Sequence, residues 1–203
     1  GYRAYFADKA RGVVLRLSAD GLGAGSNQSD TQVAGASVGG GYMTALSLLK
    51  NKDQYDFNLL FLPGIIDQAA GAGHNVISQE AIQLCEDRGD CFAIIDPVEY
   101  GKNIVNATDQ SDGKDSSYAA MYWPWVKVPD SQLAGTQRWV PPSVVLGGIY
   151  AFNDKVAHPW FAPAGLNRGG ITTAIQAERK LTQADRDTLY DSNVNPICSL
   201  SKN

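Results

Sequence analysis

The chain has 203 residues, 44% of them hydrophobic, which is enough to build one large or two small domains around a buried core. This composition excludes compositional disorder, and a net charge of −4 with only 17 scattered basic residues argues against a nucleic-acid or anionic-membrane partner. The low charged fraction of 19% and the 21 glycines are the unusual features.

Three cysteines, Cys85, Cys91 and Cys198, are too few for a disulfide scaffold and lack the paired spacing of a zinc site. We therefore expect thiols that pack as small core residues in a reducing compartment. The first residues, 1–5, contain neither a starting Met nor an apolar signal core, and no window approaches 18 consecutive apolar residues. These features predict a soluble chain, excised from a longer protein.

The N-terminal part of the chain predicts one strand and one long loop. Residues 13–17 are mostly apolar and predict the strand, while residues 20–41 are rich in Gly, Ser, Asn, Asp and Thr and predict the loop. From Tyr42 an amphipathic helix is expected, with Leu46 and Leu49 on its buried face, ending near 51–52.

A βαβ unit follows. Residues 57–62 predict a strand buried on both faces and closed by Pro63-Gly64, and residues 91–95 predict a second such strand, ended by Asp96. Between them we expect a helix from Ser78 as N-cap to Gly89, with Ala81, Ile82 and Cys85 buried. Strand, helix and strand with short connections place the two strands in parallel in one sheet, with a right-handed crossover.

The C-terminal half predicts one strand and two longer helices. Residues 101–117 are polar and predict mostly loop, after a short helix at 99–105, and an aromatic-rich strand at 118–126 has Pro124 near its end. A helix is expected from Pro141 to about Asp154, and Gly147-Gly148 inside it predicts close approach of another element. The last helix is capped by Thr182 and ends near Tyr190.

One catalytic pattern is present. Residues 35–39 match the G-x-S-x-G nucleophile elbow, and Ser37, Asp96 and His158 follow the Ser, Asp, His order of α/β-hydrolases. The elbow requires a buried strand before the serine, whereas residues 30–34 are poorly suited to one, and further glycines nearby favour a chance match. A serine hydrolase using these three residues is the alternative function.

Signals for metal, cofactor and carbohydrate binding and for glycosylation are weak in this sequence. His74 and His158 are isolated from other ligand types, and the glycines at 21–25 lack dinucleotide spacing, so we expect no metal and no cofactor. The sequons at Asn27 and Asn106 are interpreted as polar turn residues. Trp123, Trp125, Trp139 and Trp160 favour core or subunit packing, with a carbohydrate-binding module using Trp123 or Trp160 left open.

Residues 141–154, Pro-Pro-Ser-Val-Val-Leu-Gly-Gly-Ile-Tyr-Ala-Phe-Asn-Asp, resemble the contractile tail sheath proteins of bacteriophages and related injection machines. Residues 162–169 are similar to the Ala-Pro-Ala segment of that family, and residues 181–197 to its helix leading to an Asn-x-Ile stop. Upstream motifs in the family order are a strand ending in Pro-Gly, a strand ending in Asp and a Tyr-Pro-Trp-type strand, at 58–64, 92–97 and 118–126. The resemblance covers the chain from about Phe57 to Ile197.

This resemblance implies a mixed α/β (α+β) fold with a parallel-sheet core and flanking helices, sometimes called subtilisin-like, without a protease triad. It implies an outward-facing β-strand and loop portion at residues 1–41, from an insertion domain, and an α/β sheath core domain at 42–203. The implied function is structural: the subunit polymerises helically around the tail tube and contracts to drive the tube through the host envelope, with no catalytic, cofactor or metal site.

The implied partners are other sheath subunits, the tail tube protein, the baseplate and the tail terminator. The implied location is the tail sheath of the virion, assembled in the host bacterial cytoplasm. In the family a further C-terminal domain follows the Asn-x-Ile stop, and an N-terminal arm links neighbouring subunits, whereas only residues 198–203 remain here. We therefore expect a truncated fragment that is monomeric in solution.

Overall fold

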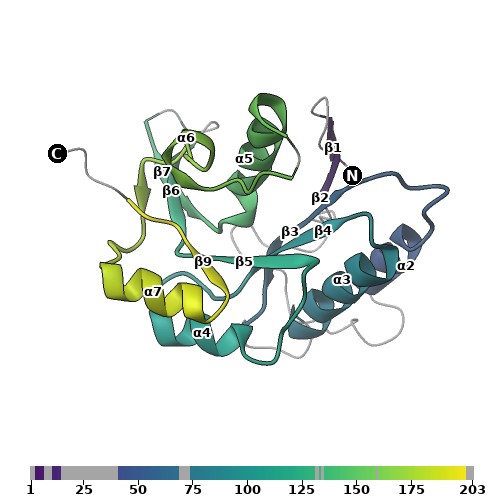
Figure 1. The fold of residues 1–203 in the computed structure, drawn as a ribbon, viewed down its shortest axis with the longest axis horizontal. Coiled ribbons are helices and arrows are strands. Elements are labelled where there is room, and N and C mark those ends of the chain that lie inside the picture. The colour runs from purple at the N-terminus through teal and green to yellow at the C-terminus, as the bar shows by residue number, and fades with distance from the viewer. Residues whose placement is uncertain are drawn as a thin grey trace.

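The computed structural model describes residues 3–6, 11–14, 41–68, 74–130, 133, 135–158 and 160–199. The predicted loop at 20–40 and the elbow serine, Ser37, lie outside this part of the chain. The strands are β1 (Arg3–Phe6), β2 (Arg11–Val14), β3 (Leu59–Ile66), β4 (Phe92–Asp96), β5 (Ala119–Trp123), β6 (Val126–Pro129), β7 (Gln137–Val140), β8 (Gln176–Ala177) and β9 (Val194–Pro196) (Figure 1). The helices are α2 (Gly41–Leu49), α3 (His74–Arg88), α4 (Ile104–Ser111), α5 (Ser143–Val156), α6 (Gly165–Arg168) and α7 (Gln183–Asp191).

The main sheet has the strand order β1-β2-β3-β4-β5-β9. Every neighbouring pair from β2 to β9 is parallel, and β1 pairs antiparallel with β2 at the edge. β3, α3 and β4 form the predicted βαβ unit, with Leu60 opposite Ala93. The predicted mixed α/β class with a parallel-sheet core is confirmed.

The N-terminal strands continue the main sheet past β3. β2 pairs in parallel with β3, with Val13 opposite Leu60, so the first residues of the strand predicted at 13–17 are confirmed as strand. Residues 15–17 lie outside the described part of the chain. The sheet thus includes residues on both sides of position 41, and the division into an outward-facing portion at 1–41 and a core at 42–203 stays a prediction.

Helices cover the two faces of the main sheet unequally. In Figure 1, α2, α3, α4 and α7 lie on one side of the sheet and α5 on the other. The larger core lies on the first side and includes Tyr42, Leu46, Leu60, Ile77, Leu84, Trp123 and Leu189, while the smaller core under α5 is formed by Leu59, Phe61, Ile94, Leu146 and Ile149. Burial on both faces explains why β3 and β4 are almost continuously apolar in sequence.

The βαβ unit differs from the prediction at two boundaries. β3 does not close at Pro63-Gly64 but continues to Ile66, and its register with β4 shifts between Phe61 and Ile66. Proline, which lacks an N–H, and Gly64, at φ +94°, fit such an irregularity within a strand. α3 begins at His74 rather than after Ser78, and the Nδ1 of His74 accepts the Ile66 N–H at 3.1 Å. A tertiary contact therefore accompanies the helix start, which local sequence does not reveal.

The rest of α3 follows the sequence. Ala81 and Cys85 are buried as predicted, whereas Ile82 is only half-buried. The helix ends before Gly89, whose φ of +69° is the left-handed conformation typical of a residue that terminates a helix.

A helix, α4, occupies residues 104–111 of the stretch that was predicted to be mostly loop at 101–117. α4 begins after Asn103, whose side chain accepts the N–H of Asn106 at 3.0 Å, while the Asn106 side chain accepts the N–H of Asn103 at 3.3 Å. This reciprocal capping box explains why the short helix expected at 99–105 is wrong and why α4 starts at Ile104. The sequon residue Asn106 is a capping residue of this helix.

The strand predicted at 118–126 is divided between two sheets. β5 ends at Trp123 within the main sheet, between β4 and β9, and β6 begins at Val126 in a second sheet of order β7-β6-β8. Pro124 lies between them, because it offers no N–H to continue the ladder.

Both C-terminal helices are confirmed. α7 begins after Thr182, whose hydroxyl accepts the Asp185 N–H at 3.2 Å. α5 begins after Pro142, and a Cβ at Gly147 would lie 3.2 Å from Cζ of Phe61, which confirms the close approach predicted there. A Cβ at Gly148 would meet no atom within 4 Å, so the predicted close approach of another element of this chain is wrong for Gly148.

Candidate functional site

The hydrolase alternative required Ser37, Asp96 and His158 to meet, and Ser37 lies outside the described residues. Asp96 is buried at the end of β4. Its carboxylate accepts two hydrogen bonds from Ser143, one from the backbone N–H at 3.0 Å and one from the side-chain hydroxyl at 2.5 Å. His158 is exposed, and its ring stacks on that of Trp160 at a centroid distance of 5.6 Å. The two side chains thus have different partners and do not form the Asp–His pair that orients a catalytic base.

Asp96 caps α5 from the neighbouring strand. The N-cap residue of α5, Pro142, supplies no side-chain hydrogen bond, so the Asp96 carboxylate takes over one of the free N–H groups of the first turn. Burial raises the pKa of Asp96 to about 7, and the hydrogen bonds from Ser143 oppose that shift. The carboxyl group at the end of β4 is therefore structural: it fixes α5 over the sheet.

A second buried carboxyl group, that of Asp67, lies just after β3. Its Oδ2 is 2.8 Å from Nζ of Lys114, which comes from the connection between α4 and β5 and also donates to the Gln110 carbonyl at 2.7 Å. Burial raises the pKa of Asp67, while Lys114 and the Ser78 hydroxyl oppose that shift. Sequence reasoning missed this pair, although a carboxyl group directly after a buried strand was a usable signal.

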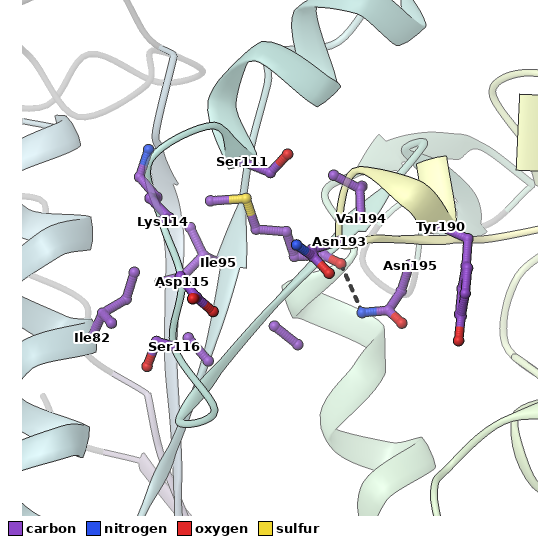
Figure 2. A pocket seen from close by; sticks show the side chains of 13 residues that line it. Ile82, Ile95, Ser111, Lys114, Asp115, Ser116, Tyr190, Asn193, Val194 and Asn195 are labelled. Carbon is purple, nitrogen blue, oxygen red and sulfur yellow. Dashed lines mark hydrogen bonds between the residues drawn. The ribbon is translucent and has the colours of Figure 1, made fainter. Parts of the chain in front are cut away.

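A half-open pocket of about 370 Å³ lies between α3, the α4–β5 connection and β9 (Figure 2). Ile82 and Ile95 form part of its apolar wall, and Lys114, Asp115 and Asn193 are among its polar residues. Asn195 Nδ2 donates to the Met121 carbonyl at 3.1 Å, the dashed line in Figure 2. Lys114 is already paired with Asp67, so its ammonium group is not a free nucleophile in this pocket.

The described residues contain no group of three or more His, Cys, Asp or Glu side chains that could hold a metal ion. The ring of His74 is buried against the end of β3. Cys85, Cys91 and Cys198 are free thiols, the first two in the larger core. Within the same part of the chain, every helix is too short or too polar to cross a membrane.

The tryptophans have different environments. Trp123 is buried in the larger core as the packing interpretation predicted, and the indole N–H of Trp125 donates to the Val98 carbonyl at 2.8 Å. Trp139 packs against Tyr100, with ring centroids 5.3 Å apart. Trp160 is 76% exposed, whereas Trp123 is buried. Of these two residues, only Trp160 could therefore stack on a sugar.

Together these observations define a class of protein: an α/β protein whose buried carboxyl groups serve capping and packing, and whose described residues assemble no catalytic or metal constellation. The chain belongs to the phage tail sheath family, because residues 35–200 match the model of the phage tail sheath protein central domain.

Relatives support this family. The tail sheath protein of Enterobacteria phage T4 is 26% identical over 175 residues, which cover 78% of this chain and 26% of the relative. That of Vibrio phage KVP40 is 42% identical over 60 residues, covering 30% of this chain and 9% of the relative. The chain therefore spans about a quarter of the length of the T4 protein.

A solved structure has a similar fold. The helical sheath of the anti-feeding prophage, in its contracted state, matches with a TM-score of 0.52 and 20% sequence identity. The match covers 77% of this chain and 39% of the sheath chain. The fold of the described residues is thus that of a contractile sheath component.

Proposed function

We propose that this chain is a structural part of a contractile phage tail sheath subunit, which polymerises helically around the tail tube and contracts to drive the tube through the host envelope. The match of residues 35–200 to the sheath central domain carries this proposal. Sequence relatives over 78% of the chain, all described as tail sheath proteins, support it.

The architecture suits a unit that moves as a rigid body. The strands β3 and β4 are buried on both faces, and the connections on either side are fixed by the Asp96–Ser143 and Asp67–Lys114 contacts. Contraction of a helical polymer requires subunits to slide and rotate while each keeps its shape. The free energy released in contraction then resides in contacts between subunits and not in refolding of this core.

The proposal includes the partners and location of the protein. The subunit contacts other sheath subunits, the tail tube protein, the baseplate and the tail terminator, and it is assembled in the host bacterial cytoplasm into the virion tail. It has no catalytic function. Labelling by a fluorophosphonate that disappears in Ser37→Ala would contradict this last point.

Immunogold electron microscopy of virions that carry the protein tests its place in the sheath. An antibody raised against the purified chain is expected to label the tail shaft, and the labelled length shortens when the tails contract. Antibody adsorbed with the purified chain is the control. Label confined to the head, or absence of the protein from purified particles by mass spectrometry, would overturn the proposal.

A further inference from the structure

The side of α5 that faces away from the sheet is apolar. Val144, Gly148, Phe152 and Val156 recur at intervals of four residues and form what we call the outer face of α5. Phe152 is 48% exposed and Val156 is 53% exposed, although the opposite side of the helix packs on β3 through Leu146 and Ile149. A helix that is apolar on both sides is typical of one that is covered on both sides.

Gly148 also indicates that the outer face of α5 is covered by a partner. A glycine in the interior of a helix is destabilising relative to alanine, so it requires a compensating close contact. Its neighbour Gly147 has such a contact with Phe61, whereas Gly148 is exposed and a Cβ there meets no atom within 4 Å. The compensation expected at Gly148 is thus absent from the chain as described, and a partner that approaches the helix backbone would supply it.

Further apolar surface lies beside and beyond α5. A shallow groove of about 470 Å³ runs beside α5 and is lined by Val145, by Val128 and Pro129 of β6, and by residues 172–175. Beyond the C-terminal end of the helix, Trp160 and Leu166 are strongly exposed. Trp160 connects to α5 through Phe161, whose ring stacks on that of Trp160 with centroids 4.2 Å apart and whose carbonyl accepts from Asn153 at 2.8 Å.

The size of this surface indicates the kind of partner. With about 150–250 Å² per aromatic side chain, Phe152 and Trp160 alone expose roughly 190–310 Å². With the valines and Leu166, the surface reaches the size of the largest apolar patches of monomers, about 300–600 Å². It remains below the roughly 800 Å² per partner of a standard stable interface. One such contact is therefore weak alone, as suits a helical array in which each copy has several neighbours.

We infer that the outer face of α5 is a contact surface for a second copy of this chain, with Gly148 at the point of closest approach. The inference rests on the proposed sheath function, because a helical polymer brings identical copies side by side. Asp154 and Lys155 are the charged residues of α5, so the contact is chiefly apolar and persists at high salt.

Sedimentation equilibrium of the purified chain at increasing concentration tests the inference. We expect a monomer at low concentration and weak self-association at high concentration. Phe152→Lys is expected to weaken the association constant at least tenfold. Val105→Glu on α4 is the matched control, since Val105 is similarly exposed (57%) and each substitution introduces the charge that its helix end favours. This control should associate as the wild type does.

Gly148→Ala gives a test in which folding and association change in opposite directions. The added methyl group has open space within the chain and favours the helix, so the midpoint of thermal unfolding rises. The same methyl group blocks close approach, so self-association weakens. A stabilised variant with undiminished association would overturn the assignment of Gly148.

A photo-crosslinking amino acid at position 152 identifies what covers the surface. Products between two copies support the inference. Products only within one chain, wild-type protein that stays monomeric at its highest soluble concentration, or Phe152→Lys that associates normally would each overturn it. None of these results bears on the labelling of virions, so a wrong surface remains distinguishable from a wrong function.

Discussion

At the residue scale, the Arg88 side chain connects several elements. Its guanidinium is buried at the end of α3, where Nη1 donates to the Leu49 carbonyl at 2.5 Å and Nη2 to the Tyr55 carbonyl at 2.9 Å. It also pairs with Asp90 at 2.8 Å and lies 4.4 Å from the ring centroid of Phe57. One side chain thus holds the end of α2, the connection to β3 and the end of α3 together.

Arg88→Ala is expected to lower the free energy of unfolding by about 2–5 kcal/mol, because it leaves the Leu49 and Tyr55 carbonyl groups without these donors and removes the guanidinium that packs on Phe57. Urea denaturation measures the loss. Lys102→Ala is the control: Lys102 also pairs with an acidic residue, Glu99 at 4.0 Å, but both side chains are well exposed (43% and 36%), so its loss should be at most about 1 kcal/mol. Similar losses in the two variants would contradict this account.

Asp96 gives a prediction about pH. Its folded-state pKa of about 7 lies above the ordinary value of 3.8, so the folded protein binds the proton more tightly than the unfolded chain does. The resulting stabilisation is fully present below about pH 3.8 and is lost as the pH rises through about 7. Asp96→Asn keeps a neutral group of the same shape beside Ser143, so this contribution to the pH dependence disappears.

The measurement is the free energy of unfolding of both proteins from pH 4 to 8. The difference between them should shift in favour of Asp96→Asn as the pH rises from about 4 to about 7 and should level off above that. The same substitution at Asp191, an exposed residue at the end of α7, is the control and should follow the wild-type profile. Parallel profiles for wild type and Asp96→Asn would show that the Asp96 carboxyl does not titrate as described.

At the element scale, capping explains both a confirmed and a missed prediction. Thr182 and Asp185 form a capping box before α7 that follows the familiar pattern of a hydroxyl and an acidic residue three positions later, and the helix was predicted. Asn103 and Asn106 form the equivalent box before α4, but two asparagines in a polar segment are also typical of a loop. The same pattern of capping hydrogen bonds thus arises from one sequence that predicts a helix start and from another that does not.

Thr182→Ala is expected to lower the free energy of unfolding by about 1 kcal/mol, since the Asp185 N–H loses its acceptor and α7 carries the fully buried Leu189 against β9. Chemical denaturation with circular dichroism measures this change. Thr188→Ala in the same helix should be neutral or slightly stabilising, because alanine favours helix and the Thr188 hydroxyl bonds only the Ala184 carbonyl behind it. A stabilising effect of Thr182→Ala would refute the capping role.

At the scale of the whole molecule, the main sheet separates a large core from a small one. Leu60 and Leu59 are adjacent in β3 and point to opposite faces, Leu60 into the core under α2 and α3 and Leu59 into the core under α5. Both are buried, but the smaller core is bounded largely by partly buried side chains. A cavity on that side has more room to relax.

Leu60→Ala should therefore fall in the upper half of the roughly 2–5 kcal/mol range for leucine truncation, and Leu59→Ala in the lower half. Urea denaturation of the two variants measures the difference, and each serves as the control for the other. A larger loss for Leu59→Ala would mean that the side under α5 is the more tightly packed one.

The sequence by itself determined the parallel core, the family and most helices, because these depend on local signals: apolar runs that are buried on both faces, caps such as Thr182, and motifs such as the one at 141–154. Only the tertiary structure decided where β3 ends and where α3 begins, since a register shift and the His74–Ile66 contact join residues that local patterns treat separately. The candidate triad shows the same limit. Order along the chain suggested that Asp96 meets His158, but burial placed Asp96 against Ser143 at the start of α5. The outer face of α5 also became visible only in the fold, because the same apolar run supplies its buried side and its exposed side.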